Sequence, residues 1–191
     1  IAALALIAAS MSASGYKLAS QPAKPYELVN GRPAGSSSVT PDDMTHFMIA
    51  HLNNGQYNGY SLLRPETAKL MHAESKKLIP PLNPMALGFY HEDLNGHVIV
   101  GHGGDTELFH SDLHLLVNDN VGIFISMNSV GKDGAVTPIR ENLLHGFMDR
   151  YYPSNAAPLP TAATAKDHAR TMAGLYWSSR RMHSSFFAML N

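Results

Sequence analysis

Hydrophobic positions along the chain change period twice, from helical spacing to alternation and back. Thr40 and Pro41, followed by two aspartates, form a helix start. A hydroxyl caps free backbone N–H groups, proline fits the first turn, and carboxylates favour the positive end of the helix dipole. Apolar residues then recur three and four apart, which predicts a helix that ends at Gly55. A second, short helix is expected from Pro65 to about Ala73.

After a proline-rich break the period becomes two, which predicts extended strands. The turns between them are expected at Asn95-Gly96, at Gly103-Gly104 and at Asn118 to Asn120, all with hairpin chemistry. The pattern therefore predicts an antiparallel β-meander. Its four runs are Ala86–Glu92, His97–Gly101, Leu108–Val117 and Val121–Asn128.

Helical spacing returns from Val136 to Tyr151, which predicts a helix lying across one face of the sheet. Its expected apolar stripe consists of Ile139, Leu143, Leu144, Phe147, Met148 and Tyr151. A meander with flanking helices is an α+β fold.

The two ends of the chain predict its domain organisation. The apolar run Ile1–Ala9 is about half the length of a membrane span, and an internal helix to about Ser12 is favoured over a signal-peptide core. The stretch 153–165 is rich in alanine and proline, as linkers are. We therefore expect one unit over 1–152, a linker over 153–165, and the start of another domain over 166–191, with a strand beginning near Gly174–Ser179. Both ends look cut, as in a piece of a longer protein.

Composition excludes several classes of function. Of the 191 residues 14 are Lys or Arg and 15 are Asp or Glu, so the net charge is −1. A chain without excess basic charge lacks the electrostatic footprint of a nucleic-acid or anionic-membrane binder, and neither partner is expected. The absence of cysteine excludes disulfides and thiolate metal sites, and it leaves the redox compartment open.

Eleven histidines raise the question of a metal site. His110, Asp112 and His114 share one face of a predicted strand, but they spread over about 13 Å at about 3.3 Å per residue. Ligands strung along one strand cannot close around a single ion. Polar histidines on a sheet face are the favoured interpretation, and neither a metal nor a cofactor is predicted.

A Ser-x-x-Lys match occurs at Ser14–Lys17. In serine hydrolases this spacing puts the nucleophile and its lysine one helical turn apart. Gly15 and the nearby Pro22 argue against a helix at this point, so a chance match is favoured.

The segment Gly101–Thr106 is the most informative candidate site. It joins two predicted strands and combines His102 with two glycines, which allow a substrate backbone to approach closely. A main-chain N–H at such a strand end can donate to a developing oxyanion. The alternative is a glycine hairpin with a histidine that has no function.

Taken together, several stretches resemble the C-terminal half of a serine β-lactamase-like protein, a family that includes class C β-lactamases, penicillin-binding DD-peptidases and related esterases. His102-Gly103-Gly104 matches the His-x-Gly form of the family's third motif, and a hairpin follows at the family's distance. The segment from Ala34-Gly35 to Met44 is similar to the turn and helix that precede this motif. The resemblance covers roughly residues 10–152 and implies that residues 1–152 are part of a larger domain. The stretch from Ala173 to Arg181 looks like the start of the β-rich accessory domain that many members carry, which implies a truncated β-rich domain over 166–191.

The resemblance implies roles for individual residues. His102 would supply charge and hydrogen bonding near the substrate, Gly104 would be the close-approach glycine, and the Asp105 N–H would be one of two oxyanion donors. Substrate would lie along the strand 101–106, including Gly103 and Thr106, by strand-like pairing. Asn128 falls near the position that holds a substrate carboxylate in class C enzymes.

The resemblance also implies what the chain lacks. The family's nucleophile and its Tyr-x-Asn motif lie upstream of the triplet, and no Tyr-x-Asn occurs here. We therefore expect a fragment of a serine hydrolase that is inactive alone, whose complete parent acts on a β-lactam, a D-amino-acid peptide or an ester. A non-catalytic peptide-binding module using the 101–106 edge, or a structural domain without a site, are the alternatives.

Two further expectations follow from half a domain. An uncovered strand edge favours self-association. Family members with this pattern are often exported to the bacterial periplasm or attached to the membrane, while the cytoplasm stays open as a location.

Overall fold

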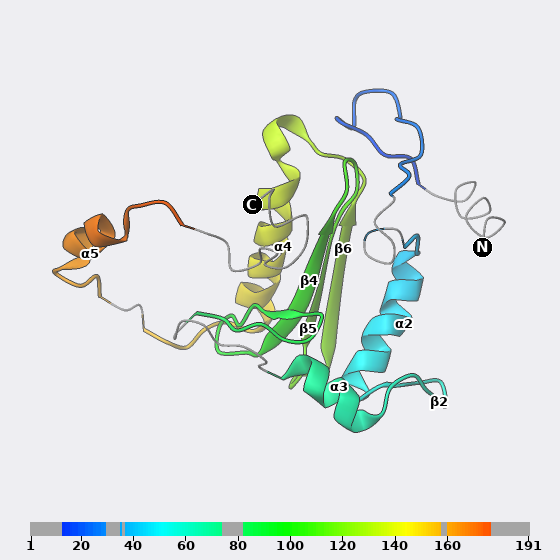
Figure 1. The fold of residues 1–191 in the computed structure, drawn as a ribbon, viewed down its shortest axis with the longest axis horizontal. Helices are drawn as coiled ribbons and strands as arrows, with labels where there is room; N and C mark the ends of the chain where they lie inside the picture. Colours follow the sequence, from blue (N-terminus) through cyan, green and yellow to red (C-terminus); the bar gives the residue numbers. More distant parts are fainter. Residues whose placement is uncertain (1–12, 30–34, 36, 74–81, 158–159, 177–191) are drawn as a thin grey trace, which may run out of the picture. The chain divides into compact units, whose positions relative to one another are not determined.

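The computed structural model describes residues 13–29, 35, 37–73, 82–157 and 160–176 (Figure 1). The chain divides into two compact units, Ile1–Asn155 and Ala156–Asn191. The division falls inside the predicted linker 153–165. The predicted helix over Ile1–Ser12 lies outside the described residues.

Helix α2 (Pro41–Leu52) begins where the sequence predicts it. The Thr40 hydroxyl accepts a hydrogen bond from the Asp43 N–H at 3.1 Å, and the Asp43 carboxylate accepts one from the Thr40 N–H at 3.0 Å. This reciprocal pair is a capping box. The hydrogen bonds from Thr40 lower the pKa of Asp43. Gly55, at φ +90°, turns the chain after the helix, and its N–H bonds the carbonyl of Ala50.

A small hairpin and a short helix follow. Strands β1 (Gln56–Tyr57) and β2 (Tyr60–Ser61) pair antiparallel around Asn58-Gly59, a hairpin that the sequence analysis did not predict. Helix α3 (Pro65–His72) lies within the predicted span.

The main sheet is an antiparallel meander, as predicted, with strand order β3-β4-β5-β6. Its strands are β3 (Tyr90–His91), β4 (Ile99–Asp105), β5 (His110–Leu116) and β6 (Val121–Met127).

Two predicted boundaries in this sheet are wrong. The run Ala86–Glu92 yields only the two residues of β3, because Gly88 at φ +76° forms a turn in which the Ala86 N–H bonds the Phe89 carbonyl. Gly103-Gly104 is not a turn but part of β4. The chain reverses after Asp105 instead.

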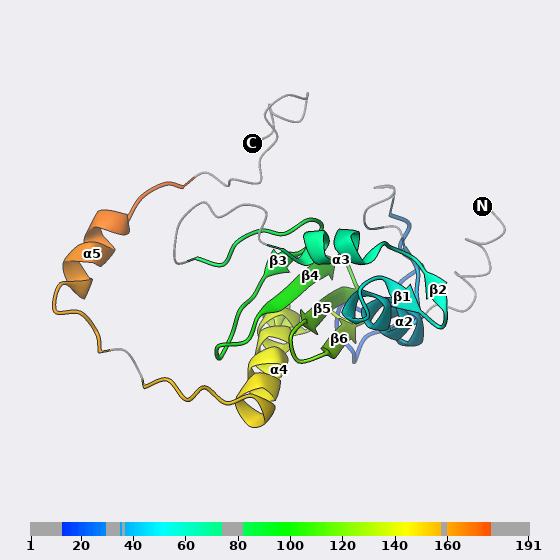
Figure 2. The same cartoon turned by 90° about the horizontal axis from the view of Figure 1, so that it is seen from below.

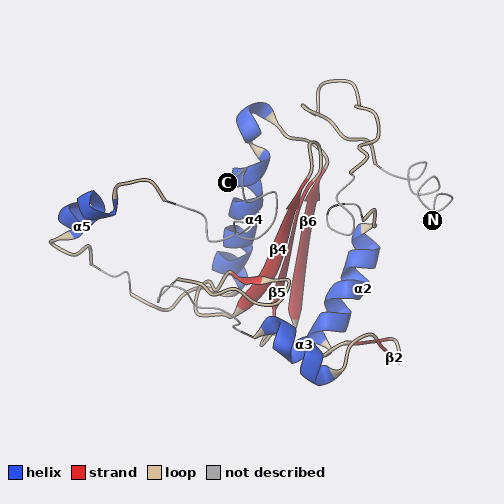
Figure 3. Cartoon of the chain, in the orientation of Figure 1, coloured by secondary structure: helices blue, strands red, loops and turns tan. Residues whose placement is uncertain are grey.

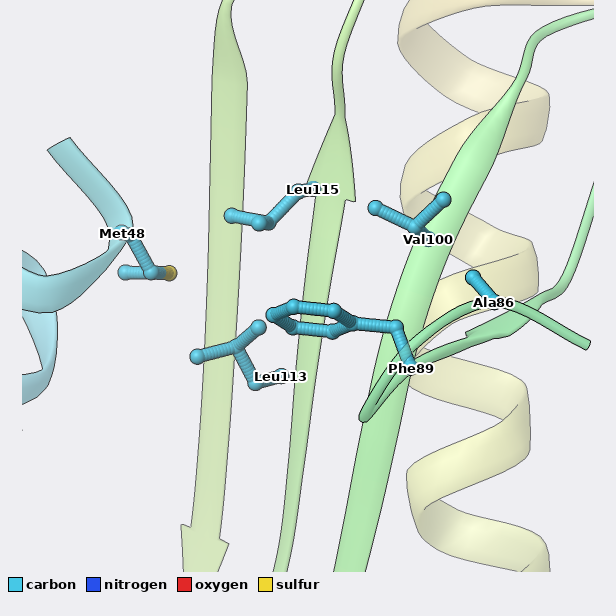
Figure 4. Close-up of a cluster of buried hydrophobic side chains, with 6 residues drawn as sticks. All are labelled: Met48, Ala86, Phe89, Val100, Leu113 and Leu115. Carbon is cyan, nitrogen blue, oxygen red and sulfur yellow. The ribbon is translucent and has the colours of Figure 1, made fainter. Parts of the chain in front are cut away.

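Helices cover both faces of the sheet (Figures 2 and 3). On the face toward α2, one hydrophobic cluster gathers side chains from α2, the segment before β3, and strands β4 and β5 (Figure 4). This cluster contains Met48, Ala86, Phe89, Val100, Leu113 and Leu115. On the opposite face Ile99 and Leu116 pack against Leu144 and Met148 of α4 (Val136–Tyr151).

The buried side of α4 differs from the predicted stripe. Every fourth residue from Val136 is buried, and the second of them is Arg140 rather than an apolar residue. Leu144 and Met148 complete this row, whereas Ile139, Leu143 and Tyr151 are exposed. The register follows from the polar part of the sheet that faces Arg140.

The second unit contains helix α5 (Ala165–Met172), which the sequence analysis did not predict. Residues 174–176 of the predicted strand Gly174–Ser179 have no regular structure, and the rest lie outside the described residues. No helix in the described part of the chain is both long and apolar enough to span a membrane.

Candidate functional site

The candidate site is the end of β4, where the strand has a free edge. β3 pairs only with Val100 and Gly101, so no described strand lies beside residues 102–105 on that side. The Thr106 N–H bonds the Phe109 carbonyl across the turn. Because main-chain groups alternate between the two sides of a strand, those of Gly103 and Asp105 point to the free edge.

His102 is exposed and lies beside Tyr90, with the ring centroids 5.3 Å apart. Its Nδ1 atom is 2.6 Å from the carbonyl oxygen of Gly103. A carbonyl only accepts, so this hydrogen bond requires the proton on Nδ1. In the neutral ring Nε2 then carries a lone pair and is a proton acceptor.

The two glycines of the triplet have different surroundings. A Cβ on Gly103 would lie 2.6 Å from the Asp112 carboxylate and 3.1 Å from the Tyr90 hydroxyl, so the protein itself leaves no room there. Among the described residues, a Cβ on Gly104 would meet only Ser111 Oγ, at 3.3 Å. Gly104 is exposed. The predicted close-approach glycine thus lies on an accessible surface.

The side chain and the main chain of Asp105 face different parts of the molecule. The side chain turns to the α4 face, where its carboxylate accepts hydrogen bonds from Arg140 Nη2 at 3.0 and 3.2 Å and lies 2.6 Å from His110 Nδ1. Partial burial alone would raise the pKa of Asp105. The hydrogen bonds and charges of His110 and Arg140 have the larger combined effect, so the pKa is lowered overall. Among the described residues no group bonds its N–H, which remains available at the free edge.

Arg140 also reaches the neighbouring strand. Its Nη1 donates to the Ser111 carbonyl at 2.9 Å and lies 3.4 Å from the Asp112 carboxylate. Burial raises the pKa of Asp112, while the charge of Arg140 acts in the opposite direction. One guanidinium therefore ties the ends of β4 and β5 together from α4.

Thr106 and Asn128 are engaged elsewhere. The Thr106 hydroxyl donates to the Glu27 carboxylate at 2.8 Å, and the same carboxylate accepts from the N–H groups of Glu107 and Leu108. Glu27 thereby holds the β4–β5 turn. The Asn128 amide donates to the Ser14 carbonyl at 2.8 Å. It follows β6, two strands and about 10 Å from β4.

A cavity of about 380 Å³ lies on the α4 side of the sheet. His114 is buried there, with Nδ1 2.6 Å from the Glu92 carboxylate, and a Cβ on Gly101 would collide with that carboxylate. Arg140 also lines this cavity. Within the described ranges no three His, Asp or Glu side chains are placed to hold a metal ion.

The Ser-x-x-Lys match is extended chain, not helix. Gly15 pairs with Lys24 and Tyr16 with Ser129, and Lys17 forms an ion pair with Glu107 at 3.4 Å. A second match that the sequence analysis overlooked, Ser129–Lys132, lies beside it and is likewise not helical at its serine. In neither match do the serine and lysine lie on one helix.

Comparison with known proteins identifies a fold. No protein-family model and no curated protein matches the sequence. Among solved structures, the octameric penicillin-binding protein homologue from Pyrococcus abyssi superimposes with a TM-score of 0.50 at 18% sequence identity. The match covers 70% of this chain and 31% of that protein, so this chain spans about a third of its length. The α+β fold is similar to that of a penicillin-binding protein homologue.

The structure thus gathers His102, Gly103, Gly104 and the Asp105 N–H at one edge and leaves Asn128 away from it. Tyr90, Glu27 and Arg140, which shape this edge, were not predicted. For Arg140 a signal existed, since a charged residue occupies the position one turn before Leu144. Tyr90 and Glu27 bond residues that lie 13 and 80 positions away in the sequence, and no local pattern predicts contacts over such separations.

Proposed function

We propose that this chain carries the third-motif part of a serine hydrolase that works through an acyl-enzyme. Three features support the proposal: the penicillin-binding protein-like fold, the exposed His102, and the N–H of Asp105, which no described residue bonds, at a strand edge that no described strand covers. The decisive one is that N–H, because a donor fixed at a strand end can stabilise a developing oxyanion.

In this function each residue has one task. The Asp105 N–H binds the substrate carbonyl oxygen and stabilises the negative charge that develops on it. His102 presents Nε2 as a proton acceptor near the reacting group. Gly104 lets the substrate approach the strand, because there is no side chain to block it. The attacking hydroxyl would belong to polypeptide upstream of this chain, in a protein exported to the periplasm or held at the membrane.

The chain alone should therefore be inactive. Without a nucleophile the covalent route is missing, and one oxyanion donor, worth about 10²–10³ in rate in a complete site, gives no useful rate by itself. A burst assay with nitrocefin and a chromogenic ester, followed by mass spectrometry, should show no acyl-enzyme. A stoichiometric burst from these 191 residues would contradict the proposal.

The upstream reading frame of the source gene provides the positive test. It should encode a Ser-x-x-Lys, followed about a hundred residues later by a Tyr-x-Asn or its equivalent. The extended protein should acylate with the burst substrates, and His102→Ala should slow this on the order of 10²-fold or more. His168→Ala, which alters an exposed histidine on α5, is the matched control and should leave the rate unchanged. An extended protein that never acylates would instead favour a non-catalytic peptide-binding module.

A further inference from the structure

The free edge of β4 contains two residues whose main-chain groups face outward, Gly103 and Asp105. These two residues differ in whether those groups already have hydrogen-bond partners. At Gly103 both groups already have partners. Its N–H donates to the Tyr90 hydroxyl, and its carbonyl accepts from His102 Nδ1. At Asp105 the N–H has no partner among the described residues.

We infer that Tyr90 and His102 close the Gly103 position, so that the edge of β4 binds a single carbonyl oxygen at Asp105 and does not pair with an extended peptide strand. This inference rests on the proposed function and narrows its substrate class to small esters and amides with one reacting carbonyl.

The physical argument concerns the geometry of strand addition. A peptide that joins an antiparallel edge bonds both main-chain groups of every second residue. To bond Gly103 it would have to displace the Tyr90 hydroxyl and the His102 ring together, and so replace two existing hydrogen bonds rather than add two. A carbonyl at Asp105 breaks no hydrogen bond made by a described residue.

The surroundings hold Tyr90 in place. Its backbone is part of β3, paired with Gly101, and its ring lies against the His102 ring at a centroid distance of 5.3 Å. The neighbouring Phe89 side chain is buried in the core between the sheet and α2. Strand pairing, the contact with His102 and the burial of the neighbouring Phe89 therefore restrict the movement of the ring that carries the hydroxyl.

Amide hydrogen exchange in the ¹⁵N-labelled chain tests the closed position directly and needs no variant. After correction for sequence, we expect Gly103 to exchange at least about tenfold more slowly than Asp105. Tyr90→Phe should raise Gly103 exchange by about tenfold, whereas Tyr60→Phe, which removes the hydroxyl of an exposed tyrosine, should not. Unchanged exchange of the buried Leu115 amide would show that each variant is folded.

Two probes then test the substrate class by amide shifts. The methyl ester of N-acetyl-D-alanine should shift Asp105 in the unaltered chain. An acetylated hexapeptide of alternating threonine and valine should shift neither amide there, and it should shift both in the double variant Tyr90→Phe, His102→Ala, in which both partners of Gly103 are removed. Equal exchange at Gly103 and Asp105, or shifts of both amides by the hexapeptide in the unaltered chain, would overturn this inference and leave the proposed function standing. An ester that leaves Asp105 unmoved would instead contradict the proposed function.

Discussion

Arg140 holds the carboxylate of Asp105 by two hydrogen bonds, at 3.0 and 3.2 Å, from the face of the sheet opposite to α2. The main chain of Asp105 points to the free edge, so a helix behind the sheet fixes the residue whose N–H we assign to substrate binding. The guanidinium is buried, so its position is fixed and it anchors Asp105 from behind the sheet.

Arg140→Met should destabilise the chain, because it leaves Asp105, Asp112 and the Ser111 carbonyl without their shared donor. Breaking a fully buried pair costs about 3–5 kcal/mol, and the half-exposed Asp105 side chain reduces this to roughly 2–3 kcal/mol. Urea unfolding measures the difference. Arg150→Met, on the exposed side of the same helix, should cost less than about 0.5 kcal/mol. Equal losses in the two variants would contradict the anchoring role.

The histidine pair between α2 and α3 should make the fold sensitive to acid. His51 Nδ1 lies 3.0 Å from His72 Nε2. Burial, together with the charge of His72, lowers the pKa of His51 to about 4, and burial together with the charge of His91 lowers the pKa of His72. Both rings gain protons more readily in the unfolded chain, so the free energy of unfolding should fall as the pH drops from about 6.5 toward 4.

Urea unfolding at pH 7.5, 6 and 4.5 gives this slope, and His51→Gln is the variant that isolates it. Asp112, whose pKa is raised, contributes with the opposite sign in the same range and is unaffected by the substitution. His51→Gln should therefore flatten the decline. The same slope in both proteins would show that the histidine pair is not its source.

Glu27 should control the β4–β5 turn. Its carboxylate accepts hydrogen bonds from Thr106 Oγ1 and from the N–H groups of Glu107 and Leu108. Glu27→Ala leaves these donors unpaired and should cost about 1–3 kcal/mol, with faster amide exchange at Leu108. Glu66→Ala, at an exposed position on α3, is the control and should leave Leu108 exchange unaltered. If Glu27→Ala behaves like this control, the carboxylate does not hold the turn.

The outer edge of β6 should mediate self-association. Apart from the bridge between Tyr16 and Ser129, no described segment pairs with that edge, and the strand Val121–Met127 carries no charge. Unpaired, uncharged edges recruit further strands. Light scattering at increasing concentration should show dimers or larger species, and Ser126→Lys, a charge at an exposed position of β6, should shift them toward monomer. A single monomeric species at high concentration in the unaltered chain would contradict this.

The elements that the sequence could predict are those specified by neighbouring residues. The capping box of Thr40 and Asp43 is complete within four residues, and Asn95-Gly96 provides the left-handed turn that a hairpin needs. Gly103-Gly104 resembles the same local signal, but a strand conformation prevails there because each residue pairs with β5. The conformation of these two glycines is set by pairing with a distant segment, and a short-range sequence pattern cannot predict such pairing.

The candidate site shows the same division. The triplet at His102 could be recognised from its letters, whereas the state of its edge depends on Tyr90, Arg140 and Glu27. These contacts join separate elements, and the local sequence does not specify how those elements are aligned against one another. The burial of Arg140 illustrates the difficulty, since its row on α4 is set by the acidic groups it meets and not by hydrophobicity.

The two glycines of the triplet differ in the space around them, and this difference decides which of them can be substituted to change ligand binding. A methyl group at residue 103 would collide with the Asp112 carboxylate inside the protein, so a substitution there would disturb the fold itself. At residue 104 the same methyl group would project over the open surface, and Ser111 is the one described residue whose hydroxyl would have to adjust. Variants meant to change which molecules fit against this strand should therefore be made at 104, where a loss of binding can be separated from a loss of the fold.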